Sequence, residues 1–191
     1  IMAWASPNWM KIGHQELVSG KLEAAEEAFL KAIDLTPTDA DAHFGLGRVY
    51  HDKGNRVEAI EQYTQAILYD PKHYKAYSNR GLAKGGMGQL EAALKDFDQA
   101  IAINPQFAAA YSNRGFTKAG LNRLREALKD FDRAIALDPR YATAYRNRGI
   151  TREFIGDLKG ACTDWKQAAA LGQPDPQIWF NRQCRAKQPG R

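Results

Sequence analysis

Four histidines are the side chains in this sequence best suited to chemistry, and all lie within the first 73 residues: His14, His43, His51 and His73. Nucleophilic or acid–base catalysis would need a serine or cysteine at a matching spacing, and no such pattern accompanies them. His14 and His51 could share a surface with Asp52, but three scattered ligands on helices are usually surface residues rather than a metal site. His43 stands in a column of core residues. We therefore expect no catalytic centre, no metal site and no cofactor.

Two cysteines, Cys162 and Cys184, are too few for a disulfide framework or a four-ligand zinc site. We expect the fold to be held by packing alone, with Cys162 filling space among small residues of a helix. The glycine-rich run at residues 85–88 lacks a following lysine and a preceding strand. It therefore predicts a helix end rather than a phosphate-binding loop, and the chain is not expected to be an enzyme.

The elements that position all these residues repeat every 34 residues. The hexapeptide AYSNRG at Ala76 recurs at Ala110 and, with one change, at Ala144. In this register one column is always glycine: Gly13, Gly47, Gly81, Gly115 and Gly149. A second column is always aromatic: Phe29, Tyr63, Phe97, Phe131 and Trp165. The five frames are residues 6–39, 40–73, 74–107, 108–141 and 142–175.

Each frame predicts two amphipathic helices, because its apolar residues recur at intervals of three and four. A residue that tolerates the left-handed backbone conformation marks the turn between them: Gly20, Gly54, Gly88, Asn122 and Gly156. A glycine inside a helix costs roughly 1 kcal/mol relative to alanine. We expect the glycine column to repay that cost by letting the first helix approach the aromatic residue of the second.

Because a 34-residue unit buries too little surface alone, neighbouring units must stack into an all-α solenoid. Residues 176–187 predict a C-terminal capping helix, in which Gln183 replaces the repeated glycine. Residues 1–5 are interpreted as an N-terminal extension or an artificial remnant, and residues 188–191 as a tail.

These columns at a 34-residue period resemble the tetratricopeptide repeat, and the last frame is similar to terminal repeats of bacterial members. The resemblance covers residues 6–175 and the capping helix. It implies a right-handed α-solenoid of helix-turn-helix repeats whose first helices line a concave surface for a peptide or partner helix. It therefore implies a non-catalytic adaptor or scaffold for protein–protein interaction.

Helical spacing selects the residues expected to face that groove in the third to fifth frames: Ser78, Asn79, Leu82, Ser112, Asn113, Phe116, Arg146, Asn147 and Ile150. An asparagine ladder could hold an extended peptide backbone through its donors and acceptors, beside an apolar row. The alternative is that the asparagines brace neighbouring helices. Some eukaryotic members bind a chaperone C-terminus with a Lys, Asn and Arg clamp, but Ser78 and Leu82 stand where the first Lys and Asn would be, so that partner is not expected.

Three arginines, Arg80, Arg114 and Arg148, fall on a face that the fold should bury. The same three frames carry an aspartate in the second helix: Asp96, Asp130 and Asp164. The first two frames lack both partners. This joint occurrence predicts an ion pair between the two helices of each hairpin, in preference to a basic binding site.

Charge is uneven along the chain: residues 1–73 carry 7 Lys and Arg against 11 Asp and Glu, and residues 74–191 carry 20 against 11. Most of these charges alternate at helical spacing, so nucleic-acid binding ranks third among the expected functions. The second is a self-associating structural module, possible as a homo-oligomer or as part of a larger chain. No membrane span is visible. We expect a cytoplasmic protein, or an exported or membrane-associated one if an upstream signal was removed.

Overall fold

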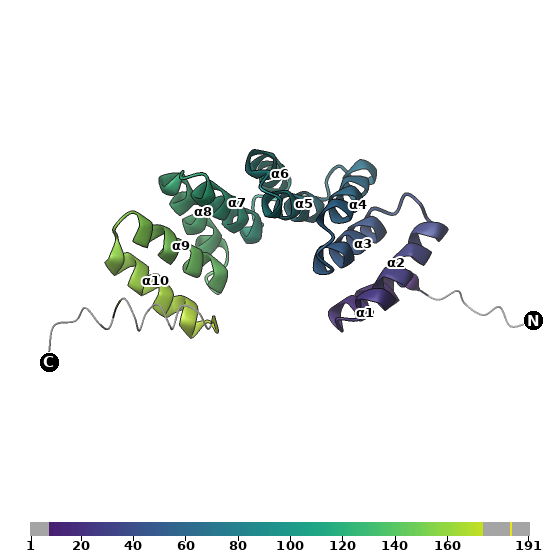
Figure 1. Cartoon of the computed structure of the whole chain (residues 1–191), viewed down its shortest axis with the longest axis horizontal. Helices are drawn as coiled ribbons and strands as arrows, with labels where there is room; N and C mark the ends of the chain where they lie inside the picture. The colour runs from purple at the N-terminus through teal and green to yellow at the C-terminus, as the bar shows by residue number, and fades with distance from the viewer. Residues whose placement is uncertain (1–7, 174–183, 185–191) are drawn as a thin grey trace, which may run out of the picture. The chain divides into compact units, whose positions relative to one another are not determined.

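The structure, a computed structural model, describes residues 8–173 and residue 184. These residues form ten α-helices and no β-strand (Figure 1). In chain order the helices are α1 (Trp9–Val18), α2 (Leu22–Leu35), α3 (Ala40–Asp52), α4 (Arg56–Tyr69), α5 (Tyr74–Gly86), α6 (Leu90–Ile103), α7 (Ala108–Gly120), α8 (Leu124–Leu137), α9 (Ala142–Phe154) and α10 (Leu158–Ala170). None of the described helices is long and apolar enough to span a bilayer.

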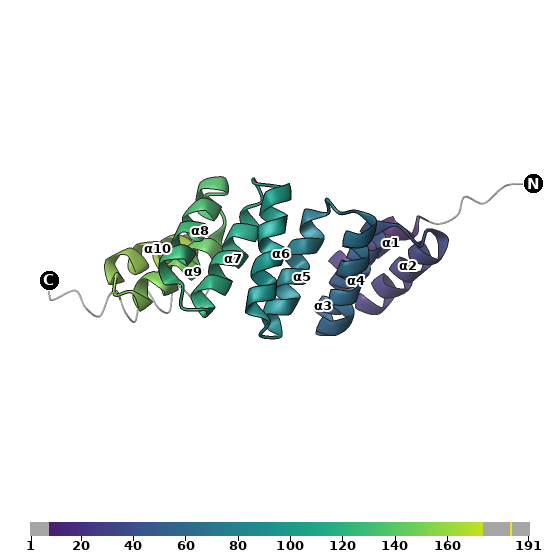
Figure 2. The same cartoon turned by 90° about the horizontal axis from the view of Figure 1, so that it is seen from above.

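The chain divides within α6 into two compact units, residues 1–96 and 97–191. In the first unit α1 packs against α2 and α3 against α4, while α2 contacts α3 and α4 contacts α5. The second unit repeats this order with α7 against α8, α9 against α10, and α8 against α9 (Figure 2). Such consecutive helix pairs confirm the all-α, solenoid-type repeat that the 34-residue period predicts.

The predicted turn residues end the first helix of each repeat in the left-handed region. The φ angle is +73° at Gly20 and +59° at Asn122, and it is also positive at Gly54, Gly88 and Gly156. At the first of these turns the Lys21 N–H donates to the Glu16 carbonyl, and at Asn122 the next residue makes the equivalent bond to Lys118. These bonds satisfy carbonyls that the ending helix leaves open, so the turn prediction is confirmed.

The glycine column allows close approach to the aromatic column, as predicted. A methyl group added at Gly47 would lie 2.7 Å from the Tyr63 ring, and one added at Gly149 would lie 2.5 Å from Trp165 Nε1. The aromatic side chains are fully buried at these positions. Any larger residue would therefore force the two helices of the hairpin apart.

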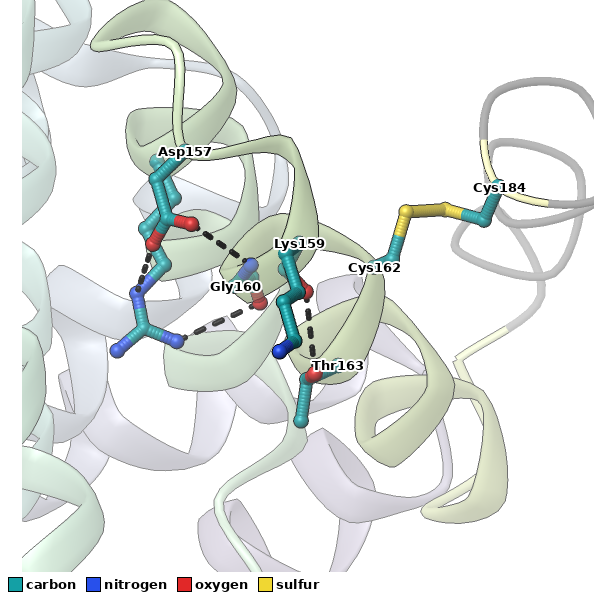
Figure 3. Close-up of a disulfide and its surroundings, with 7 residues drawn as sticks. Asp157, Lys159, Gly160, Cys162, Thr163 and Cys184 are labelled. Carbon is teal, nitrogen blue, oxygen red and sulfur yellow. Dashed lines mark hydrogen bonds and ion pairs between the residues drawn. A yellow bond between two sulfur atoms is a disulfide. The ribbon is translucent and has the colours of Figure 1, made fainter. Parts of the chain in front are cut away.

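Packing is not the only link in the last repeat, because Cys162 of α10 forms a disulfide with Cys184 (Figure 3). Cys162 is half-buried rather than a core-filling residue. The expectation of a fold without disulfides was wrong. The Cα atoms of the two cysteines lie 5.8 Å apart although 22 residues separate them, and such proximity does not follow from two isolated positions in a sequence.

The remaining terminal predictions fall largely outside the described residues. The capping helix predicted at residues 176–187, except Cys184, lies outside the described residues. The N-terminal extension at residues 1–5 and the tail at 188–191 lie outside them as well.

Candidate functional site

Two of the nine residues predicted for the groove are inaccessible to a ligand. Ser78 and Ser112 are each only 1% exposed. In the second unit the Ser112 side chain lies beside Tyr141: burial raises the pKa of the Tyr141 hydroxyl, and the neighbouring serine opposes that rise. These serines occupy the side of the first helix that faces the fold.

The predicted asparagines also make contacts within the protein. Asn147 is 7% exposed, and its Oδ1 accepts a hydrogen bond of 3.3 Å from Arg146. Asn79 lies beside Tyr63, where burial raises the pKa of the tyrosine hydroxyl and the asparagine opposes the rise. Asn113 is half-buried. Asn79 of α5 thus contacts Tyr63 of α4, as the bracing alternative requires, whereas the Asn147 contact lies within α9.

The apolar members of the predicted set are the most accessible. Phe116 is 61% exposed in the second unit, and Leu82 is also exposed in the first. Ile150 is half-buried. An aromatic side chain as exposed as Phe116 contributes little to the free energy of folding. It is therefore a candidate for contact with a partner molecule.

Phe116 and Ile150 line one apolar cleft of about 390 Å³ in the second unit. It lies where the end of α7 and the start of α8 meet α9, and this volume is within the range of about 300–1,000 Å³ found for ligand pockets. The complete lining is Phe116, Ala119, Gly120, Asn122, Leu124, Phe131, Asn147, Ile150, Thr151 and Phe154. We call this group the apolar cleft.

Phe154 is the most important member that the sequence analysis missed. It is 75% exposed, and it takes the position at which the two preceding repeats have Gly86 and Gly120. That exchange of glycine for phenylalanine in one column was a usable signal. The expected groove followed the centre of each first helix, whereas the observed cleft is displaced toward its C-terminal end.

A second recess adjoins the apolar cleft and is basic. Both share Asn122 and Leu124, and the second is completed by Arg123, Arg125, Glu126 and Ile155. Arg125 is exposed at the start of α8. We call this group the basic recess. The two together place an apolar surface directly beside guanidinium groups.

The predicted ion pairs hold the helices that form the cleft. Arg114 Nε and Nη2 donate to the two Asp130 carboxylate oxygens at 2.9 and 2.6 Å, and Lys118 Nζ lies 2.8 Å from the same carboxylate. Burial alone would lower the pKa of the Arg114 guanidinium, but hydrogen bonds to Asp130 and Asp98 outweigh it and leave this pKa raised. The arginine is thus a fixed cation between helices, and the predicted pairing is confirmed.

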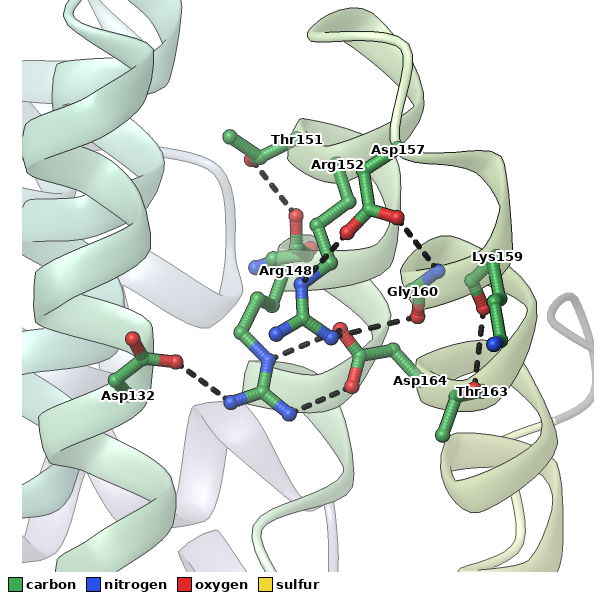
Figure 4. Close-up of polar contacts among 10 residues, drawn as sticks. Asp132, Arg148, Thr151, Arg152, Asp157, Lys159, Gly160, Thr163 and Asp164 are labelled. Atoms are coloured by element: carbon green, nitrogen blue, oxygen red, sulfur yellow. Dashed lines mark hydrogen bonds and ion pairs between the residues drawn. The ribbon is translucent and has the colours of Figure 1, made fainter.

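Each of these arginines also has a partner in the preceding repeat, which the sequence analysis missed. Arg148 donates to Asp164 of its own hairpin and, through Nη1 at 2.6 Å, to Asp132 of α8 (Figure 4). Arg114 bonds Asp98 in the same way at 2.7 Å. The second partner stands 16 residues before the arginine and the first 16 residues after it. That symmetric spacing was readable in the sequence.

The histidines have structural contacts in the first unit. His43 is buried, with Nδ1 2.8 Å from Gln62 Oε1 and Nε2 3.0 Å from the Pro37 carbonyl. His73 Nδ1 accepts from the Ala76 N–H at the start of α5. Across residues 8–173 and 184, no three His, Cys, Asp or Glu side chains gather as a metal site requires.

Comparison with known proteins gives repeat-family matches over most of the chain. A model described as TPR repeat matches residues 13–54 and 47–88, and one described as Tetratricopeptide repeat matches residues 74–107 and 108–141. A search of curated proteins finds no match.

Several solved structures are similar to the chain. MamA is 25% identical with a TM-score of 0.72, over 87% of this chain and 97% of that one. YrrB, a TPR protein with an unusual peptide-binding site, is 22% identical with a TM-score of 0.68, over 91% and 90%. The pilF protein of Pseudomonas aeruginosa is 18% identical with a TM-score of 0.81, over 96% and 91%. The last two likenesses show a shared fold.

Proposed function

Because the chain belongs to the tetratricopeptide repeat family, we propose that it is a non-catalytic adaptor that binds a segment of a partner protein in the apolar cleft of its second unit. The family matches and the likeness to a peptide-binding structure support an interaction module. The observation that carries the proposal is the apolar cleft, because Phe116 and Phe154 are exposed beside Ile150 in a single concavity. Aromatic residues in such positions are typical anchors of protein interfaces.

The proposal assigns different roles to the residues predicted from the sequence. Phe116 and Ile150 contact the partner, and Asn113 offers its amide to the partner's backbone. Asn147 positions the wall of the cleft, since it is almost fully buried. In the first unit, Leu82 offers an exposed apolar side chain of its own.

The disulfide bears on where the protein works. Disulfides persist in oxidising compartments and are rare in the cytosol. The Cys162–Cys184 bond therefore favours the exported alternative over the cytoplasmic expectation. Labelling of free thiols in intact cells tests this: protection of both cysteines is expected, and full labelling under native conditions would contradict it.

Site-specific photo-crosslinking tests the binding function. A photoreactive phenylalanine analogue replaces Phe116 in one variant and Leu68 in another, two apolar residues that are 61% and 65% exposed. We expect a discrete adduct from position 116 in the native host and none from position 68. An adduct from position 68 alone, or from neither position, would refute the proposed function.

A double variant then separates binding from folding. Asn113→Ala with Phe116→Ala is expected to leave the free energy of unfolding within ~0.5 kcal/mol, because neither side chain is buried. The crosslinked partner, once purified, is expected to bind at least tenfold more weakly, which corresponds to about 1.4 kcal/mol. Leu68→Ala is the control and leaves affinity unchanged. An early melting of the double variant with intact binding would assign both residues to the scaffold.

A further inference from the structure

We propose that the partner segment is an acidic peptide: one large apolar side chain enters the apolar cleft and a carboxylate beside it contacts Arg125 in the basic recess. This inference rests on the proposed function and adds the chemistry of the partner. It follows from how the second unit distributes its charges and from the shared wall of the two recesses.

Most acidic side chains of the second unit are already engaged by internal cations. Residues 97–173 contain eight Asp and Glu, and six of them pair with only four cations: Arg114, Lys118, Arg148 and Arg152. The six are Asp98, Glu126, Asp130, Asp132, Asp157 and Asp164. The same range contains twelve Lys and Arg residues, so its formal net charge is +4. This part of the second unit therefore carries an excess of positive charge.

Part of that positive charge stands next to the cleft. Arg125 is exposed and lines the basic recess, which shares Asn122 and Leu124 with the apolar cleft. The one carboxylate in the recess, Glu126, lies 3.8 Å from Lys118 Nζ. A peptide carboxylate beside Arg125 would thus meet a positive local potential, and complementary charge directs both association and register.

The apolar cleft determines the other half of the ligand. Its walls are mainly Phe116, Ile150 and Phe154, with Leu124 at the boundary to the basic recess. These walls match a Phe, Leu or Met side chain, which would be removed from water on entry. Since the two recesses share Asn122 and Leu124, the anchor and the carboxylate are expected to lie close together in the sequence of an extended peptide.

Selection from a displayed library of random dodecapeptides tests the inference with a defined probe. The full-length wild type is compared with Arg125→Glu, with Phe116→Ala, and with Lys166→Glu, which reverses an exposed charge on α10 away from both recesses. We expect wild type and Lys166→Glu to enrich an apolar anchor flanked by Asp or Glu. Arg125→Glu should lose the acidic preference, and Phe116→Ala should lose the anchor.

The affinity for one enriched peptide, measured by fluorescence polarisation, should fall at least tenfold in Arg125→Glu. Raising the salt concentration should weaken binding by the wild type more than binding by this variant. Enrichment of apolar anchors with no preference for acidic flanks overturns this inference and leaves the proposed function standing. If the wild type enriches no peptide more strongly than Phe116→Ala does, both this inference and the proposed function are overturned.

Other occupants of the cleft give different results, each of which also overturns the inference. If a second copy of the chain fills it, no peptide is enriched, and the mass by light scattering falls in Phe116→Ala. If the basic surface serves nucleic acid, a labelled oligonucleotide is retained equally by wild type and Phe116→Ala, with no acidic peptide selected.

Discussion

The second and fourth repeats have the same helical hairpin but connect its two helices through different side chains. In the second repeat, His43 Nδ1 lies 2.8 Å from Gln62 Oε1, and Leu46 follows His43 one helical turn later. In the fourth repeat the equivalent residues are Tyr111, Asp130 and Arg114, with the arginine bonded to the aspartate and stacked 5.5 Å over the tyrosine ring.

This difference shows that the hairpin forms on the glycine and aromatic columns that both repeats share, while the polar residues between its helices can vary as a group. They vary together because a buried cation without its carboxylate is costly. The arginine-containing version also forms an ion pair with the preceding repeat, through Asp98 and Asp132 in the second unit, whereas His43 contacts the Pro37 backbone carbonyl there. It therefore adds a link between repeats to the link within each repeat.

The largest expected effect comes from breaking the fourth-repeat cluster. Asp130→Leu removes the buried carboxylate that the half-buried Arg114 and Lys118 share, which should lower the free energy of unfolding by about 3–5 kcal/mol. Gln62→Leu, at the equivalent position, removes a neutral hydrogen bond and should cost about 0.5–1.5 kcal/mol. Urea denaturation of both variants measures the contrast.

The full cycle adds Arg114→Leu, Lys118→Leu and the triple leucine variant. The triple variant should recover much of the stability that Asp130→Leu loses, because the carboxylates that lose their partners, Asp98 and Glu126, are exposed to water. Strict additivity of the three changes would show that the cluster is not coupled.

A smaller effect is expected from the disulfide, which exists only in the second unit. Cys162→Ser should destabilise the last repeat by roughly 3 kcal/mol, since the bond closes a loop across 22 residues and restricts the unfolded chain. Hydrogen exchange should accelerate in α10 and remain unchanged in α1–α4. Cys184→Ser and the double variant should match the single one, and acceleration spread evenly along the chain would contradict a local role.

The smallest effect comes from transplanting a link between repeats into the first unit. Arg80 Nη1 lies 3.1 Å from Thr64 Oγ1, at the position that Asp98 and Asp132 occupy for the later arginines. Thr64→Asp should therefore raise the free energy of unfolding by a few tenths, up to ~1 kcal/mol, as an exposed ion pair does. Leu30→Asp is the matched control, since Leu46 rather than arginine lies 16 residues after it. An equal gain in both variants would mean that net charge, not pairing, is responsible.

The candidate site was only partly predictable from the sequence. Spacing correctly selected Phe116 and Ile150 as residues of one surface, and both line the cleft. It also selected Ser112, which is buried, because a helical wheel separates two faces but does not show how far each neighbouring helix covers them. Phe154 was overlooked because the prediction followed residues that recur, and Phe154 is a departure from its column.

What the sequence determined by itself is what every repeat shares. The period, the turn at Gly20 and its equivalents, the approach of Gly47 to Tyr63, and the pairing of Arg114 with Asp130 all follow from residues within one hairpin. Only the tertiary structure decided two features that arise between hairpins or beyond them: the cleft between α7, α8 and α9, and the disulfide to Cys184. The physical reason is that the repeated residues determine each hairpin locally. The rotation from one hairpin to the next depends instead on many weak packing contacts, and no single repeated position determines it.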